Sequence, residues 1–253
     1  MPEKYYLSPT EQSVMDTTID MGVIFAEDII RSLEGLNPQS VRNALHSLAG
    51  KGRLCRVKRG VYLRCEGPNS PVIEDPAVMA LAVFKGYIAF SSALRHWGLI
   101  EYEPFTIFVV TRDKSGTKEI GEYTLRAVSM GAKAQVMTYD KGVYVSSPEK
   151  TIFDCIYKPK YSGGYRVVAD AVAESSPDWS EVGRWFDLLG SQSLRQRGGY
   201  IMSRAGNAPD RMLDRLRTGA KHKVWLDPSG KRKGRYVREW RLIDNVEGWH
   251  ERR

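Results

Sequence analysis

Apolar and polar positions along the first 64 residues alternate with helical periodicity, and capping signals mark where helices begin. Ser8-Pro9-Thr10-Glu11 has the sequence of a capping box, and Asn37-Pro38 is a second capped start. An apolar run at 23–25 indicates a short strand between these two starts. The pattern predicts three helices, over residues 9–20, 26–33 and 38–50.

The third predicted helix has one apolar side and one polar side. Its apolar side is formed by Val41, Ala44, Leu45 and Leu48. Its polar side carries Gln39, Ser40, Arg42, Asn43 and His46. Beyond it, residues 54–57 and 61–64 predict two strands joined by the basic turn Lys58-Arg59-Gly60. Three helices, a short strand and a cationic hairpin are typical of a winged helix-turn-helix domain.

The net charge of +8 adds to this picture because the basic residues are concentrated. The 23 residues from Arg42 to Arg64 include seven Lys or Arg and no Asp or Glu. In winged helices the third helix enters the major groove of DNA while the hairpin lies along the phosphates. We therefore expect the polar side of the third helix to bind DNA together with four basic residues of the hairpin region: Arg53, Arg56, Lys58 and Arg59.

Two side chains of the third helix suit direct recognition of bases. Arg42 can bind guanine through two hydrogen bonds, and Asn43 can bind adenine in the same way. One alternative is a solvated helix face followed by an ordinary charged turn. Another is a winged helix that binds a protein or RNA without recognising DNA sequence.

The remainder of the chain is predicted to be a mixed α/β domain over 77–253, after a linker at 67–76 that is rich in Pro, Gly and Ser. Strands are expected over 105–111, 123–128 and 142–145. Helices are expected from Pro76, near 90–98, from Pro148, and near 164–175, 179–189, 191–204 and 209–218. The fold class is therefore α+β, with a winged helix-turn-helix domain at 1–66.

Basic residues are also concentrated near the end of the chain, where residues 195–253 hold sixteen Lys or Arg and seven Asp or Glu. A final hairpin is expected over 222–243, with a basic tip at 231–235. Aromatic residues alternate with cations there, which suits a second surface for DNA or unpaired RNA. This candidate surface comprises Lys231, Arg232, Lys233, Arg235 and Arg238. The alternative is that Trp225, Tyr236 and Trp240 belong to the core and that the cations are solvated.

Four stretches of the chain resemble the AbiEi-type antitoxins of abortive-infection, type IV toxin–antitoxin systems. They are GRLCRVKRGVY (52–62), SSALRHWGL (91–99), VSSPEKTIFD (145–154) and LRQRGGYI (194–201). They follow one another in the family's order and span most of the chain. Gly198-Gly199 departs from the pair of an apolar residue and a glycine that the family has at this point.

The resemblance implies a winged-helix transcriptional repressor that binds inverted repeats in its own operon. It also implies an antitoxin that counters a nucleotidyltransferase-type toxin without forming a stable complex with it. On this basis we expect operator DNA and the toxin as partners, no membrane, no cofactor, and a monomer or weak dimer.

Signals for catalysis are weak. The sequence has no P-loop, no dinucleotide-binding glycine motif, no HExxH and no GxSxG. Glu149 and Lys150 have the residue types of a metal-dependent nuclease, which stays an alternative, but Glu149 at a helix start is better explained by the helix dipole. We therefore expect that the protein is not an enzyme and that it has no catalytic residues and no metal site. We expect Asp154 to form an ion pair with a basic neighbour.

The three cysteines are Cys55, Cys65 and Cys155. An odd and sparse number favours a reducing compartment over a secreted disulfide scaffold. Cys55 and Cys65 could face each other across the predicted hairpin, so a disulfide between them stays open. No apolar run approaches the roughly 18 residues needed to span a bilayer, and residues 1–6 lack the features of a signal peptide. The expected location is the cytoplasm.

Overall fold

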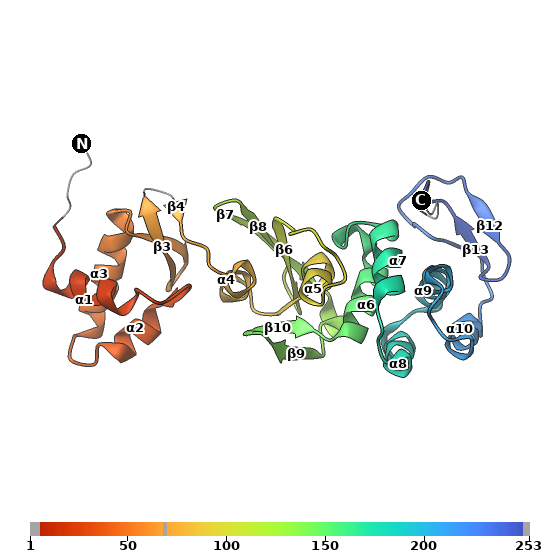
Figure 1. Ribbon diagram of the computed structural model, residues 1–253, viewed down its shortest axis with the longest axis horizontal. Helices are drawn as coiled ribbons and strands as arrows, with labels where there is room; N and C mark the ends of the chain where they lie inside the picture. Colours follow the sequence, from red (N-terminus) through yellow and green to blue (C-terminus); the bar gives the residue numbers. More distant parts are fainter. Residues whose placement is uncertain (1–5, 68–69, 250–253) are drawn as a thin grey trace. The chain divides into compact units, whose positions relative to one another are not determined.

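The computed structural model describes residues 6–67 and 70–249, which form an α+β fold (Figure 1). The chain divides into two compact units. The first comprises the residues up to 86 together with 105–128, and the second comprises 87–104 together with the residues from 129 onward. This division differs from the ranges expected from the sequence. Within the expected linker, Ser70 and Pro71 form a short strand, while residues 68–69 lie outside the described part of the chain.

The first unit begins with the helices and hairpin that the sequence predicts. Their bounds are α1 Pro9–Thr17, β1 Ile24–Phe25, α2 Ala26–Ser32, α3 Pro38–Gly50, β2 Leu54–Lys58, β3 Val61–Gly67 and β4 Ser70–Pro71. The predicted helix starts are confirmed. Ser8 and Glu11 form a reciprocal capping box, and the Asn37 side chain accepts a hydrogen bond from the Gln39 amide at 2.8 Å.

The three helices pack around a small apolar core beside the hairpin (Figure 1). The four apolar residues of α3 named above are all buried in it. Strand β3 pairs antiparallel with both β1 and β2, in the order β1-β3-β2. The Lys51 ammonium, at the end of α3, lies 2.7 Å from the Glu11 carboxylate in α1. This hydrogen bond, with smaller contributions from Ser47 and Ser8, lowers the pKa of Glu11 to about 2.

The rest of the first unit consists of one helix and three strands. They are α4 Pro76–Val83, β6 Thr106–Thr111, β7 Gly116–Ile120 and β8 Tyr123–Ser129, with the strands in the order β7-β8-β6. Strand β7 was not expected, because Thr117, Lys118 and Glu119 give no apolar alternation. It forms through its pairing with β8, across a turn in which Gly121 has a φ of +58°.

The second unit combines a small sheet with a group of packed helices (Figure 1). Strand β10 (Val143–Ser146) pairs parallel with β5 (Tyr87–Ile88) and antiparallel with β9 (Met137–Asp140). The helices are α5 Phe90–His96, α6 Pro148–Tyr157, α7 Tyr165–Glu174, α8 Trp179–Leu189, α9 Gln192–Ala205 and α10 Asp210–Arg217. All six lie where the sequence predicts helices, and strands β5 and β9 were not expected.

Three of the four stretches that resemble the antitoxin family meet in this unit. They correspond to α5, α6 and α9, and α6 packs against both of the others. Lys150 and Asp154 of α6 are fully buried and form an ion pair, which confirms the expected basic partner of Asp154. Burial raises the pKa of Asp154, while the Lys150 ammonium acts in the opposite direction. The Lys150 Nζ also lies 3.5 Å from the Tyr87 hydroxyl oxygen.

The adjacent glycines of α9 leave room for two aromatic rings. A Cβ at Gly198 would lie 2.4 Å from Cε1 of Phe186, and one at Gly199 would lie 2.1 Å from Cζ3 of Trp240. Both distances are far inside van der Waals contact. The two rings are themselves fully buried. Close packing of these two rings therefore leaves space only for glycine at residues 198 and 199.

The prediction of a hairpin over 222–243 with its tip at 231–235 is wrong in where it places the strands and the turn. The strands are β11 Val224–Trp225, β12 Arg235–Val237 and β13 Leu242–Asp244, in the order β11-β13-β12. The turn between β12 and β13 falls at 238–241, where Arg241 has a φ of +46°. A continuous strand would put Trp240 on the same face as Tyr236, which is 44% exposed. The turn instead directs the Trp240 ring against Gly199, where it is fully buried.

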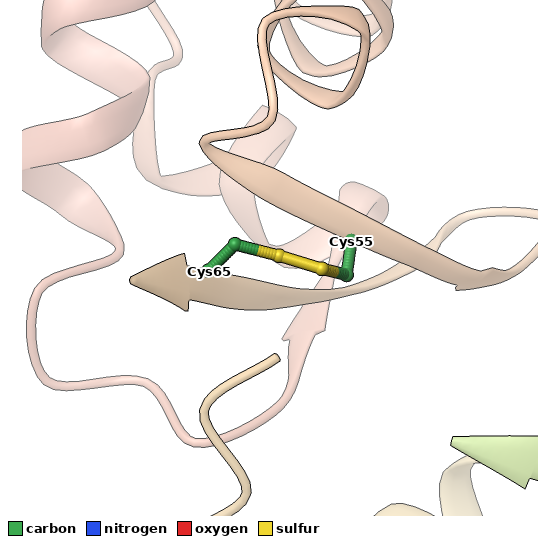
Figure 2. Close-up of a disulfide and its surroundings, with 2 residues drawn as sticks. All are labelled: Cys55 and Cys65. Carbon is green, nitrogen blue, oxygen red and sulfur yellow. A yellow bond between two sulfur atoms is a disulfide. The ribbon is translucent and has the colours of Figure 1, made fainter. Parts of the chain in front are cut away.

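The sulfur atoms of Cys55 and Cys65 are joined in a disulfide across the β2–β3 hairpin (Figure 2). Their Cα atoms are 6.0 Å apart, within the range that a disulfide spans. The low number of cysteines favours reduced thiols, so the disulfide differs from this expectation. The number of cysteines says nothing about which thiols lie close together, and here the pairing of β2 with β3 brings two of them together. Cys155 is a buried free thiol, and burial raises its pKa to about 12.

Candidate nucleic-acid interface

The polar side of α3 and the β2–β3 hairpin face a common groove of about 620 Å³ in the first unit. Helix α3 contributes Gln39, Arg42, Asn43, Leu45 and His46. The hairpin contributes Arg56, Arg59, Gly60 and Tyr62, and the first turn of α2 contributes Ala26 and Glu27. Six of the nine residues that the sequence predicts as a DNA site therefore lie around one groove.

The groove is cationic on both walls. Arg42 stands on α3, and Arg56 and Arg59 stand on the hairpin, all three with exposed side chains. Within the described part of the chain, the structure gives none of these three guanidinium groups an ion pair or hydrogen bond. Three unpaired guanidinium groups around one groove suit a polyanion, because each can neutralise a phosphate or bind a guanine edge.

The amide side chains of the groove are already oriented by each other. The Gln39 Nε2 donates a hydrogen bond of 2.9 Å to Asn43 Oδ1, one helical turn further on. This bond leaves the Asn43 amino group pointing away from Gln39 as a donor. The capped start at Asn37 fixes the backbone of the same turn.

The hairpin is fastened to the helices at its tip. The amide of Ala26, the first residue of α2, donates a hydrogen bond of 2.9 Å to the Gly60 carbonyl. Gly60 has a φ of +75°, a conformation that favours glycine. The disulfide joins the two strands toward the other end of the hairpin. The arginines on the hairpin therefore stand on a backbone that is held at both ends.

Three of the predicted residues do not line the groove. Ser40 is exposed on α3, and Arg53 is exposed in the segment before β2. The Lys58 ammonium donates a hydrogen bond of 3.0 Å to the carbonyl of Val83 at the end of α4. The hydrogen-bond partner of Lys58 is thus 25 residues away in the sequence, and no local pattern indicates this contact.

Other groove residues were missed from the sequence. Glu27 and Tyr62 line the groove, but the sequence places Glu27 only in a predicted helix and Tyr62 only in a predicted strand. Neither has a local signal for a site, because each reaches the groove through the packing of α2 and of the β2–β3 hairpin against α3.

The second predicted surface is partly engaged in contacts within the chain. Lys231 forms an ion pair with Glu247 at 2.9 Å, and the Arg232 guanidinium lies over the Trp225 ring, 5.2 Å from its centre. Lys223 lies in the same way over Tyr236, at 4.9 Å. Lys233, Arg235 and Arg238 are exposed, so a nucleic-acid role for this surface stays a prediction. Of the aromatics, Trp240 belongs to the core, as the alternative has it, whereas Tyr236 is exposed.

The candidate nuclease residues are not brought together. Lys150 is buried, while the Glu149 carboxylate accepts a hydrogen bond of 3.3 Å from the amide of Asp178. Across residues 6–67 and 70–249, no group of three or more His, Cys, Asp or Glu side chains is placed to hold a metal ion. Over the same ranges, no helix has the length and apolar character needed to cross a membrane.

Comparison with known proteins identifies a shared fold. The crystal structure of the Rv2827c protein from Mycobacterium tuberculosis is similar, with a TM-score of 0.68 and 17% sequence identity. The similarity covers 97% of this chain and 94% of that chain. No family model matches the sequence, and no curated protein matches it. At 17% identity the likeness shows the fold of nearly the whole chain and carries no information about chemistry.

Proposed function

We propose that this protein is a sequence-specific DNA-binding repressor of the antitoxin type, and that its first 66 residues act as a winged helix-turn-helix domain. The groove between α3 and the β2–β3 hairpin carries the proposal, because it gathers Arg42, Arg56 and Arg59 without ion-pair partners. The order of three helices and a basic hairpin supports it. The four stretches that resemble the AbiEi-type antitoxins support the assignment to that class of repressor.

In this proposal the two walls of the groove have different tasks. Helix α3 enters the major groove, where Arg42 binds a guanine and the free amino group of Asn43 donates to an adenine. Arg56 and Arg59 bind phosphates on either side of the groove and release counterions. The hairpin supplies affinity for any DNA, and α3 supplies the preference for an operator.

The first prediction separates these tasks. Arg42→Ala should relax the preference at one guanine position by about 1–3 kcal/mol while binding to unrelated DNA stays nearly intact. Arg59→Ala should weaken binding to all DNA and lower the slope of log affinity against log salt by about one unit. Competition binding of the full chain to duplexes selected from a random pool measures both, at several salt concentrations.

Two further variants serve as controls for this measurement. Arg31→Ala removes an exposed cation of the same unit that is paired with Asp28 and does not line the groove, so it should change neither quantity. Lys58→Ala should have a smaller effect than Arg59→Ala, because the Lys58 ammonium is engaged by Val83. Salt-dependent binding without any preference among sequences would instead favour a general nucleic-acid-binding or interaction module.

The second prediction concerns the antitoxin role. Production of this chain should restore growth to cells that produce a nucleotidyltransferase-type toxin encoded beside it. The double variant Arg42→Ala/Arg59→Ala should restore growth equally well, because we assign the antitoxin activity to the second unit. The two proteins should elute separately in size-exclusion chromatography. Persistent growth arrest at matched toxin levels would contradict this part of the proposal.

A further inference from the structure

The groove contains one carboxylate among its cations. Glu27 is the second residue of α2, its side chain is exposed, and it lines the same groove as Arg42, Asn43 and Arg59. The structure gives it no ion pair and no side-chain hydrogen bond within the described residues. An acidic residue in this place is unfavourable for a surface whose only task is to bind phosphates, because like charges repel.

Helix stability alone does not require the carboxylate of Glu27. Acidic residues in the first turn of a helix stabilise it through the helix dipole. The neighbouring Asp28 already supplies such a charge in the same turn, and it is paired with Arg31 at 2.8 Å. Asp28 does not line the groove. The two acidic residues thus share a helix turn and differ in whether they face the groove.

We propose that Glu27 is a specificity-determining residue of the interface, which rests on the proposed DNA-binding function. Its carboxylate accepts a hydrogen bond from the exocyclic amino group of a cytosine in the major groove, which is the base contact that an acidic side chain favours. Where no such amino group is in reach, the carboxylate stays unpaired near phosphates and weakens binding. Glu27 therefore lowers affinity for unrelated DNA and selects one C·G pair beside the positions contacted by α3.

The test compares Glu27→Ala with Asp28→Ala in the full-length protein, because alanine removes the charge and the hydrogen-bond acceptor together. Both variants remove one negative charge from the first turn of α2, so they change the net charge equally. The Asp28 variant also releases Arg31, which does not line the groove. Each protein is used to select duplexes from a randomised pool, and affinities for the selected and unrelated duplexes are then measured at one salt concentration. Thermal unfolding of each variant checks that the first unit is folded.

Glu27→Ala should lose preference at one cytosine position by about 5- to 150-fold, while the other selected positions persist. It should also bind unrelated duplexes more tightly than Asp28→Ala does. A selected sequence identical to that of the wild type would overturn the role of Glu27 and leave the proposed DNA-binding function intact. If the wild type selects no sequence at all, both the proposed function and the role of Glu27 fail.

Discussion

Lys150→Met should lower the free energy of unfolding of the second unit by about 3–5 kcal/mol. The substitution leaves the fully buried Asp154 carboxylate without its ammonium partner, and an unpaired buried charge is far more costly than a paired one. All six tryptophans belong to the second unit, so their fluorescence in a urea titration follows the unfolding of this unit.

A second variant tests the cause of this loss. Lys150→Met/Asp154→Leu removes both charges and should recover most of the stability, because apolar residues of similar size replace buried ion pairs at little cost. The pair Arg166–Asp170 has the same spacing in α7 but is exposed, with 3.8 Å between Nε and Oδ2. Arg166→Met should therefore change the unfolding free energy by less than about 1 kcal/mol.

The pH dependence of Lys150→Met has a defined sign. Without Lys150, burial keeps the pKa of Asp154 in the folded state above its value in the unfolded chain. The folded state then binds a proton more readily than the unfolded state, so stability should rise as pH falls from neutral toward about 4. Equal stability of the single and double variants at neutral pH would show that the unpaired Asp154 carboxylate is not the cause of the loss.

Gly199→Ala should destabilise the second unit by about 1–3 kcal/mol or more. The added methyl group would lie 2.1 Å and 2.2 Å from two ring atoms of Trp240, a side chain that is fully buried and has no free space to enter. The favourable effect of alanine in a helix, roughly 0.5–1 kcal/mol, is too small to compensate. The same fluorescence titration measures the change, and Trp240 is itself one of the reporters.

Gly183 of α8 provides the matched control. It is also a buried helical glycine of the second unit, but a methyl group there would meet the nearest atom, Cγ of Met212, at 3.6 Å. This distance is ordinary van der Waals contact. Gly183→Ala should therefore be neutral or stabilising by up to about 1 kcal/mol. If Gly199→Ala proves as stable as Gly183→Ala, the close approach of Trp240 does not restrict the size of residue 199.

The sequence predicts those features that depend on neighbours within about four residues. The starts of α1, α3 and α6 follow from caps and from proline at the first helical position, and the structure places them there. The polar side of α3 and the turn of the β2–β3 hairpin follow from local periodicity and from Gly60. These interactions form within one turn of the chain, so the local sequence is sufficient to specify them.

The remaining features depend on contacts between distant segments, and only the tertiary structure decides them. The Lys58 ammonium donates a hydrogen bond to the carbonyl of Val83, which is 25 residues away. Glu27 faces the groove because α2 packs beside α3, and Trp240 turns toward Gly199 of α9. Strands β7 and β9 likewise form because a partner strand satisfies their backbone hydrogen bonds, not because of their apolar pattern. The sequence alone determined the cationic helix and hairpin; tertiary packing decided which of their charges stay free to bind.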